Sequence, residues 1–132
     1  NTPFDFRKGK KIGRDIYREN TQLKLGNGYD HCWVLNNYNK KLRKVSELYS
    51  NQTSIKMEVY TDQPGIQLYT GNFLDGSLNS KNGKKYVNRS GLCLETQFFP
   101  NSTNNRIFPS TIMEPGMKFA SRTSFKFTTF KK

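Results

Sequence analysis

Three polar residues stand in or beside apolar runs of the sequence, where their side chains could do chemistry. Glu95 lies within GLCLETQFF, close to Leu94 and Phe98. A carboxylate removed from water has a raised pKa and can accept a proton near neutrality. The sequence is equally compatible with a Glu95 that pairs with a basic residue or is exposed on the polar face of a strand, so both interpretations stay open.

Gln67 and Asp30 are the other two candidates. Gln67 lies in QPGIQLYTG, and a buried amide without partners costs about 1–3 kcal/mol, so we expect either core hydrogen bonds or a ligand contact. Asp30 precedes the run HCWVL; its residue type favours an Asx turn, and the alternative is a carboxylate that accepts hydrogen bonds from ligand hydroxyls. A base, an amide and a second carboxylate on β-strands together suit a cleft for a polyhydroxylated ligand.

The histidine and cysteine content indicates no metal site. His31 is the only histidine, and Cys32 and Cys93 are the only cysteines. Zinc needs three or four such ligands at suitable spacing, so we expect no metal and no cofactor. Two cysteines fit a reducing compartment, although one disulfide stays open, and we expect a cytoplasmic location. Neither a signal peptide nor a long apolar stretch is present, so no membrane partner is expected.

The formal net charge of +12 raises the alternative of nucleic-acid binding. The basic residues come in short groups beside turn-forming Gly or Asn, as in RKGKK (7–11), KKLRK (40–44) and KNGKK (81–85). No recognition-helix pattern or basic-aromatic stacking motif accompanies them. We interpret them as solvated loops and exposed strand faces, and expect no nucleic-acid partner.

Elements with a period of two must position these residues. SIKMEVYTD (54–62) and KFASRTSFKFTTF (118–130) alternate apolar with polar residues, and Gly, Pro and Asn punctuate the runs. Only residues 12–20 could form a helical turn or two. The 132 residues have the length of one domain, and a mean hydropathy of −0.83 predicts modest stability. We therefore expect an all-β, antiparallel β-sandwich or barrel, with little or no helix, over a single segment 1–132.

Several motifs carry a resemblance that covers nearly the whole chain: TPFDFR, IGRDI, GYDH, QPGIQLYTGNFLDG, RSGLCLETQFFPNS, FPSTIMEPG and SFKF. In this order they are similar to the C-terminal half of the aldose 1-epimerase (galactose mutarotase) family. The resemblance implies part of an antiparallel β-supersandwich with a sugar cleft. It also implies an isomerase of carbohydrate and hexose metabolism that interconverts the α and β anomers of free aldohexoses such as galactose and glucose.

The resemblance also implies residue roles. Glu95 would be the general base that removes the proton from the anomeric hydroxyl, while Asp30 and Gln67 would bind the sugar. A histidine would protonate the ring oxygen, and the open aldehyde would rotate and close on its other face. His31 is not at the position of that acid, so we expect it to be structural, orienting the turn or Asp30.

The family's acid lies in an upstream HxYFNL-type block that this sequence lacks. We therefore expect a C-terminal segment of a longer enzyme, whose missing N-terminal half, a complementary chain or a homodimer mate completes the sheets and supplies the acid. The alternative is a non-catalytic sugar-binding remnant or a regulatory carbohydrate-binding module.

Overall fold

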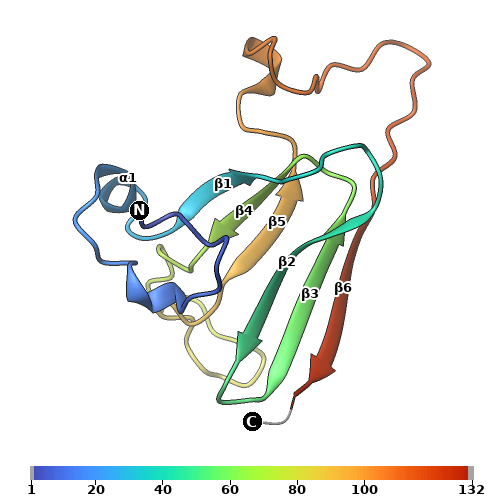
Figure 1. The fold of residues 1–132 in the computed structure, drawn as a ribbon. Helices are drawn as coiled ribbons and strands as arrows, with labels where there is room; N and C mark the ends of the chain where they lie inside the picture. The colour runs from blue at the N-terminus through green and yellow to red at the C-terminus, as the bar shows by residue number, and fades with distance from the viewer. Residues whose placement is uncertain (1, 131–132) are drawn as a thin grey trace. The chain divides into compact units, whose positions relative to one another are not determined.

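The computed structural model describes residues 2–130, in which six strands form two three-stranded sheets (Figure 1). One sheet has the order β1-β4-β5 and the other the order β2-β3-β6. The strands are β1 (Asp30–Val34), β2 (Arg43–Ser50), β3 (Ile55–Thr61), β4 (Gly65–Tyr69), β5 (Cys93–Gln97) and β6 (Thr123–Thr129). The pairing is antiparallel, which confirms the predicted all-β class.

In the described part of the chain, helical structure is limited to one short α-helix and two 3-10 turns. They are α1 (Thr21–Leu25), η1 (Ile12–Arg14) and η2 (Ser102–Asn104). The prediction of a helical turn within 12–20 is confirmed by η1. The helix α1 begins beyond that range, because the Asn20 side chain caps it by accepting hydrogen bonds from the N–H groups of Gln22 and Leu23. Within residues 2–130, no helix is long and apolar enough to cross a membrane.

Two compact units divide the chain. The first comprises Asn1–His31 and Gln67–Glu95, and the second comprises Cys32–Ile66 and Thr96–Lys132. The core of the first unit is aromatic: Tyr29 is fully buried, and the rings of Phe4 and Phe6 pack edge-on against it at centroid distances of 5.9 and 5.3 Å. Such rings bury a large area per residue, which explains how a sequence of low hydropathy forms a core here.

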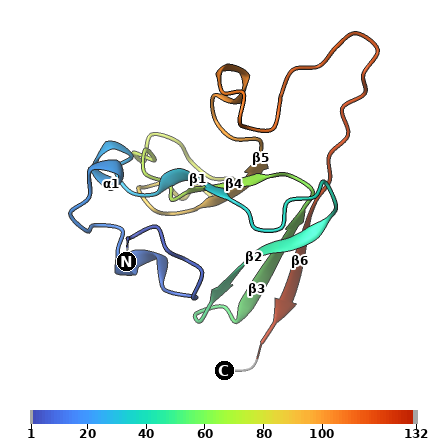
Figure 2. The same ribbon diagram turned by 45° about the horizontal axis from the view of Figure 1, so that its top comes forward.

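The second unit contains the sheet in which the predicted alternation is clearest. β3 lies between β2 and β6, and the turned view in Figure 2 shows the three strands side by side. Met57 pairs with Leu48 on one side and Phe127 on the other, and Val59 pairs with Phe125. Directly opposed residues share a face, so these side chains form one apolar face of the sheet.

That apolar face is unevenly covered. Val59 is fully buried, but Phe125 and Phe127 on the outer strand β6 are 47% and 63% exposed. The sequence predicts one polar and one apolar face for this strand, and the alternation is confirmed by its register with β3. Within the described residues, the apolar side of β6 nevertheless faces solvent.

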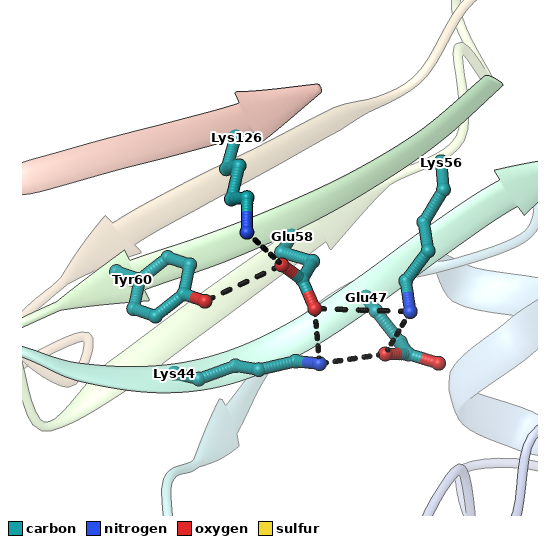
Figure 3. A network of polar contacts seen from close by, with 6 residues as sticks. All are labelled: Lys44, Glu47, Lys56, Glu58, Tyr60 and Lys126. Atoms are coloured by element: carbon teal, nitrogen blue, oxygen red, sulfur yellow. Dashed lines mark hydrogen bonds and ion pairs between the residues drawn. The ribbon is translucent and has the colours of Figure 1, made fainter. Parts of the chain in front are cut away.

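The opposite face carries a network of ion pairs (Figure 3). Its members all project from β2, β3 and β6: Lys44, Glu47, Lys56, Glu58, Tyr60 and Lys126. Lys44 Nζ lies 2.8 Å from Glu47 and 2.5 Å from Glu58, and Lys126 Nζ lies 3.7 Å from Glu58. Three of the lysines are therefore paired with glutamates on this strand face.

Candidate functional site

The strand register brings Asp30 and Gln67 to one face of β1 and β4. The Thr70 N–H donates to the Tyr29 carbonyl at 3.0 Å, which places Asp30 opposite Tyr69 in an antiparallel pair. Gln67 lies two residues before Tyr69 on β4 and so shares that face. Gln67 Nε2 donates a 2.8 Å hydrogen bond to Asp30 Oδ1. Two candidates that are far apart in the sequence are therefore in direct contact.

The other end of the Gln67 amide has no partner among the residues that the structure describes. Gln67 Oε1 is buried and accepts no hydrogen bond from any described residue. Nε2 thus makes a hydrogen bond within the fold, as one interpretation of Gln67 expects, whereas the ligand contact stays a prediction. An unpaired buried acceptor costs about 1–3 kcal/mol, so Oε1 is an energetic cost within the described part of the fold.

Asp30 is half-buried at the start of β1, and its carboxylate accepts the hydrogen bond from Gln67. The hydrogen bond therefore runs across two strands and is not the local bond of an Asx turn, which residue type alone favours. Sequence reasoning missed this because the partner is 37 residues away.

Glu95 lies on β5, the strand beside β4 in the order β1-β4-β5 (Figure 1). On the same side of β5, the Gln97 side chain lies near the Cys32 thiol, and Cys32 alternates with Asp30 along β1. Because alternate residues of a strand share a face, Glu95 lies on the face that carries Asp30 and Gln67. The three candidates therefore occupy one face of adjacent strands.

Of the two interpretations of Glu95 that the sequence leaves open, the described structure does not show the carboxylate removed from water. Glu95 is exposed, as in the alternative interpretation that places it on the polar face of its strand. Leu94 and Phe98 do not shield it, because residues an odd number of positions away along a strand point to the opposite face.

His31 points to the opposite face of β1 from Asp30. Its ring lies edge-on to Phe4 at 4.8 Å, and its Nδ1 accepts a 3.0 Å hydrogen bond from the backbone N–H of Asp30. Burial lowers the pKa of His31, and the negative charge of Asp30 only partly opposes this. These contacts agree with the expected role of orienting the backbone at Asp30.

Metal-ligating clusters are absent from the described part of the chain, where no group of three or more His, Cys, Asp or Glu side chains is arranged to hold an ion. Cys32 and Cys93 are free thiols, and burial raises the pKa of Cys32.

One residue beside these strands was not among the site residues selected from the sequence. Arg89, in the loop before β5, sends its guanidinium to Asn27, Thr70 and Asn72. An arginine amid Asn, Ser and Gly resembles an ordinary loop residue. Its partners come from two other parts of the chain, so only the tertiary structure identifies it.

The sequence matches known proteins along most of its length. Residues 1–126 match the family model described as Aldose 1-epimerase. The galactose mutarotase of Homo sapiens is 40% identical over 127 residues, and that of Bos taurus is 39% identical; each alignment covers 96% of this chain and 35% of the relative. The aldose 1-epimerase of Escherichia coli (strain K12) is 33% identical over 128 residues, with 96% of this chain and 36% of the relative covered. The chain thus spans about a third of the length of the curated relatives it matches.

A solved structure agrees with this at the level of the fold. A GalM/aldose epimerase homologue from C. elegans superimposes with a TM-score of 0.73 at 22% identity, and the match covers 99% of this chain and 38% of that chain. With a family model that matches nearly the whole sequence, the conclusion is direct: the chain belongs to the aldose 1-epimerase family.

Proposed function

We propose that the complete protein containing this chain interconverts the α and β anomers of free aldohexoses such as galactose and glucose. The observation that carries the proposal is the placement of Asp30, Gln67 and Glu95 on one face of β1, β4 and β5, with Gln67 Oε1 as an unpaired buried acceptor. Membership of the aldose 1-epimerase family supports it. The names of the relatives, galactose mutarotase and aldose 1-epimerase, supply the reaction.

In this proposal Asp30 and Gln67 hold sugar hydroxyls. Asp30 is a carboxylate acceptor, and the hydrogen bond from Nε2 to Asp30 orients the amide so that Oε1 is also an acceptor. A sugar offers several hydroxyl donors on one face, which matches two neighbouring acceptors. The pair would bind and orient the substrate and take no part in proton transfer.

Glu95 is proposed as the general base that takes the proton of the anomeric hydroxyl. Its exposed carboxylate can meet a ligand on the face that Asp30 and Gln67 share. Ring opening also needs an acid at the ring oxygen. His31 does not fit this role, because it lies on the other face of β1 with its ring against Phe4. We place the acid, a histidine, outside these 132 residues.

Completion of the site involves other residues of the protein. We propose that the two units are parts of a single sandwich domain, the C-terminal part of a cytoplasmic enzyme. An N-terminal half, a complementary chain or a second copy would supply the acid and cover Phe125 and Phe127. Neither nucleic acid nor membrane is among the proposed partners.

A second candidate is a non-catalytic sugar-binding module. It is favoured by the fact that Asp30 and Gln67 are paired within this chain, whereas the proposed acid is not part of it. This candidate expects saturable galactose binding without acceleration of mutarotation.

Polarimetry distinguishes the two candidates. Freshly dissolved α-galactose changes its optical rotation slowly in buffer, and the complete protein is expected to accelerate that change in proportion to its concentration. A rate equal to the spontaneous one, together with binding in calorimetry, would favour the module; absence of both would reject both candidates.

A further inference from the structure

We infer that Arg89 is a positioning residue for the Asp30–Gln67 pair, a role that rests on the proposed function. Its guanidinium joins the turn that leads into β1 to the turn that follows β4. Asp30 is the first residue of β1 and Gln67 lies in the middle of β4, so this link sets how the two side chains approach each other.

The guanidinium is held on both sides. Nη2 donates to the Asn27 carbonyl at 2.7 Å, three residues before Asp30. Nη1 donates to Asn72 Oδ1 at 2.6 Å and reaches Thr70 Oγ1 at 3.3 Å, three residues after Gln67. The planar fork of arginine is suited to this arrangement, because its donors diverge at fixed angles toward separate acceptors.

The acceptors on the β4 side belong to a buried network that also holds the start of β1. Thr70 and Asn72 are only 4% and 3% exposed. Asn72 Nδ2 donates to the carbonyls of Gly26 at 2.6 Å and Tyr29 at 2.9 Å, and the Tyr29 N–H donates to Thr70 Oγ1 at 3.2 Å. Because Asn72 Oδ1 also accepts a hydrogen bond from Arg89, the guanidinium is part of the same network that fixes the backbone next to Asp30.

The backbone at Gly28 makes room for the guanidinium. Gly28 has a φ of +128°, and a Cβ there would lie 2.6 Å from Asn72 Oδ1 and 2.7 Å from Arg89 Nη1. Arg89 itself has a φ of +64°. This conformation costs an L-residue conformational free energy, which its contacts must offset. Tyr17 closes the outer side, with its hydroxyl 3.1 Å from Nε and its ring centroid 5.2 Å from Cζ.

These contacts predict an effect on sugar binding more than on proton transfer. The hydrogen bonds of Arg89 go to residues that flank Asp30 and Gln67, and in the described chain none goes to Glu95. Loss of the Arg89 hydrogen bonds should therefore raise KM and leave kcat nearly unchanged. Loss of a residue needed only for folding would instead lower the fraction of active protein, and so the apparent kcat, at constant KM.

The test is Arg89→Lys in the complete protein, which keeps the charge but not the fork. For galactose mutarotation we expect KM to rise at least fivefold and kcat to fall less than twofold. Arg106→Lys is the matched control, because Arg106 is exposed and its side chain has no hydrogen bond or ion pair with the described residues. An unchanged KM for Arg89→Lys, or a loss confined to kcat, would overturn the inference.

Tyr17→Leu provides a second variant if Arg89→Lys does not fold. Tyr17 is 77% exposed, so its replacement should be tolerated, and it removes the outer support of Arg89. We expect a rise in KM of about twofold to threefold, and an unchanged KM would count against the positioning role of Arg89.

A readout independent of activity separates this inference from the proposed function. In NMR spectra of the complete protein, the Gln67 side-chain amide protons should exchange with solvent at least fivefold faster in the Arg89→Lys variant, because the bond to Asp30 is loosened. A wild-type protein without mutarotase activity would reject the proposed function, while unchanged exchange would reject the positioning role of Arg89.

Discussion

Gln67 Nε2 donates a 2.8 Å hydrogen bond to Asp30 Oδ1, and the opposite atom of the same amide, Oε1, is buried without a partner in the described chain. A carboxylate can only accept, so it fixes which end of the amide faces it. The atoms of the pair that are not used in this bond are acceptors, so the proposed function requires a ligand that supplies donors. Sugar hydroxyls meet that requirement.

Asp30 and Gln67 should act as a unit in sugar binding. In a double-mutant cycle with Asp30→Ala and Gln67→Ala, we expect the effects on galactose affinity to be non-additive by about 1 kcal/mol, because each single change already breaks the shared bond. Calorimetric titration of the wild type, both single variants and the double variant measures the coupling. Strictly additive losses would show that the two side chains bind independently, and an unchanged affinity in every variant would show that neither binds the sugar.

His31 should make the protein less stable in mild acid. Burial lowers the pKa of the folded-state imidazole below its ordinary value of 6.5, so the unfolded chain takes up the proton first as the pH falls. Stability is expected to decline as the pH falls below about 6.5 and to level off below the folded-state pKa. NMR titration, with His31→Gln used to assign the resonance, measures that pKa; a value at or above 6.5 would contradict the packing described here.

Glu58 is an acid and His31 is a base, but Glu58 should also make the protein less stable as the pH falls. Its hydrogen bond with Lys44, aided by the charges of Lys56 and Lys126, lowers the pKa of the Glu58 carboxyl (Figure 3). Its stabilising contribution is present above the unfolded-state pKa near 4.5 and is lost as the pH falls through the lowered value.

Chemical denaturation at pH 6 and pH 3 tests this contribution of Glu58. The stability gap between wild type and Glu58→Gln should narrow at the lower pH. Glu114→Gln is the control, because Glu114 is exposed in a loop and should show no gap at either pH. A gap that persists at pH 3 would mean that the ion pairs are not its source.

Phe127 tests whether other residues of the complete protein cover β6. Phe127 is 63% exposed here; if it is covered in the complete protein, Phe127→Ala should cost about 3–5 kcal/mol of unfolding free energy, as buried Phe→Ala changes do. Phe119→Ala is a matched control, since Phe119 is 64% exposed but lies outside the sheet. A cost for Phe127→Ala within about 0.5 kcal/mol would indicate a surface position and reject the covered sheet.

The sequence predicts the strands well where the alternation of side chains is visible within one segment. The pattern of Ile55, Met57 and Val59 is confirmed by their register with β2 and β6. Asp30 and Gln67 could be selected because a polar residue in an apolar run is unusual. Their mutual hydrogen bond could not be predicted, since it depends on the register between two strands distant in the chain.

The errors and omissions have the same physical origin. Leu94 and Phe98 made desolvation one of two interpretations of Glu95, but neighbours at odd spacing lie on the other face of a strand. Arg89 lies in a quoted motif but was not selected as a site residue, because its environment is assembled from the turns at residues 27 and 70–72. Residue types and periodicity identify the faces of a strand, whereas contacts between residues that are distant in the sequence can be identified only from the tertiary structure.

The central claim is that Glu95 removes the anomeric proton, and the most direct measurement is polarimetry of α-galactose with Glu95→Gln in the complete protein. A positioned base contributes about 10²–10⁴-fold to the rate, so we expect kcat to fall by about that factor while KM changes little. Glu114→Gln should retain wild-type activity. A Glu95→Gln protein with wild-type kcat would contradict the account.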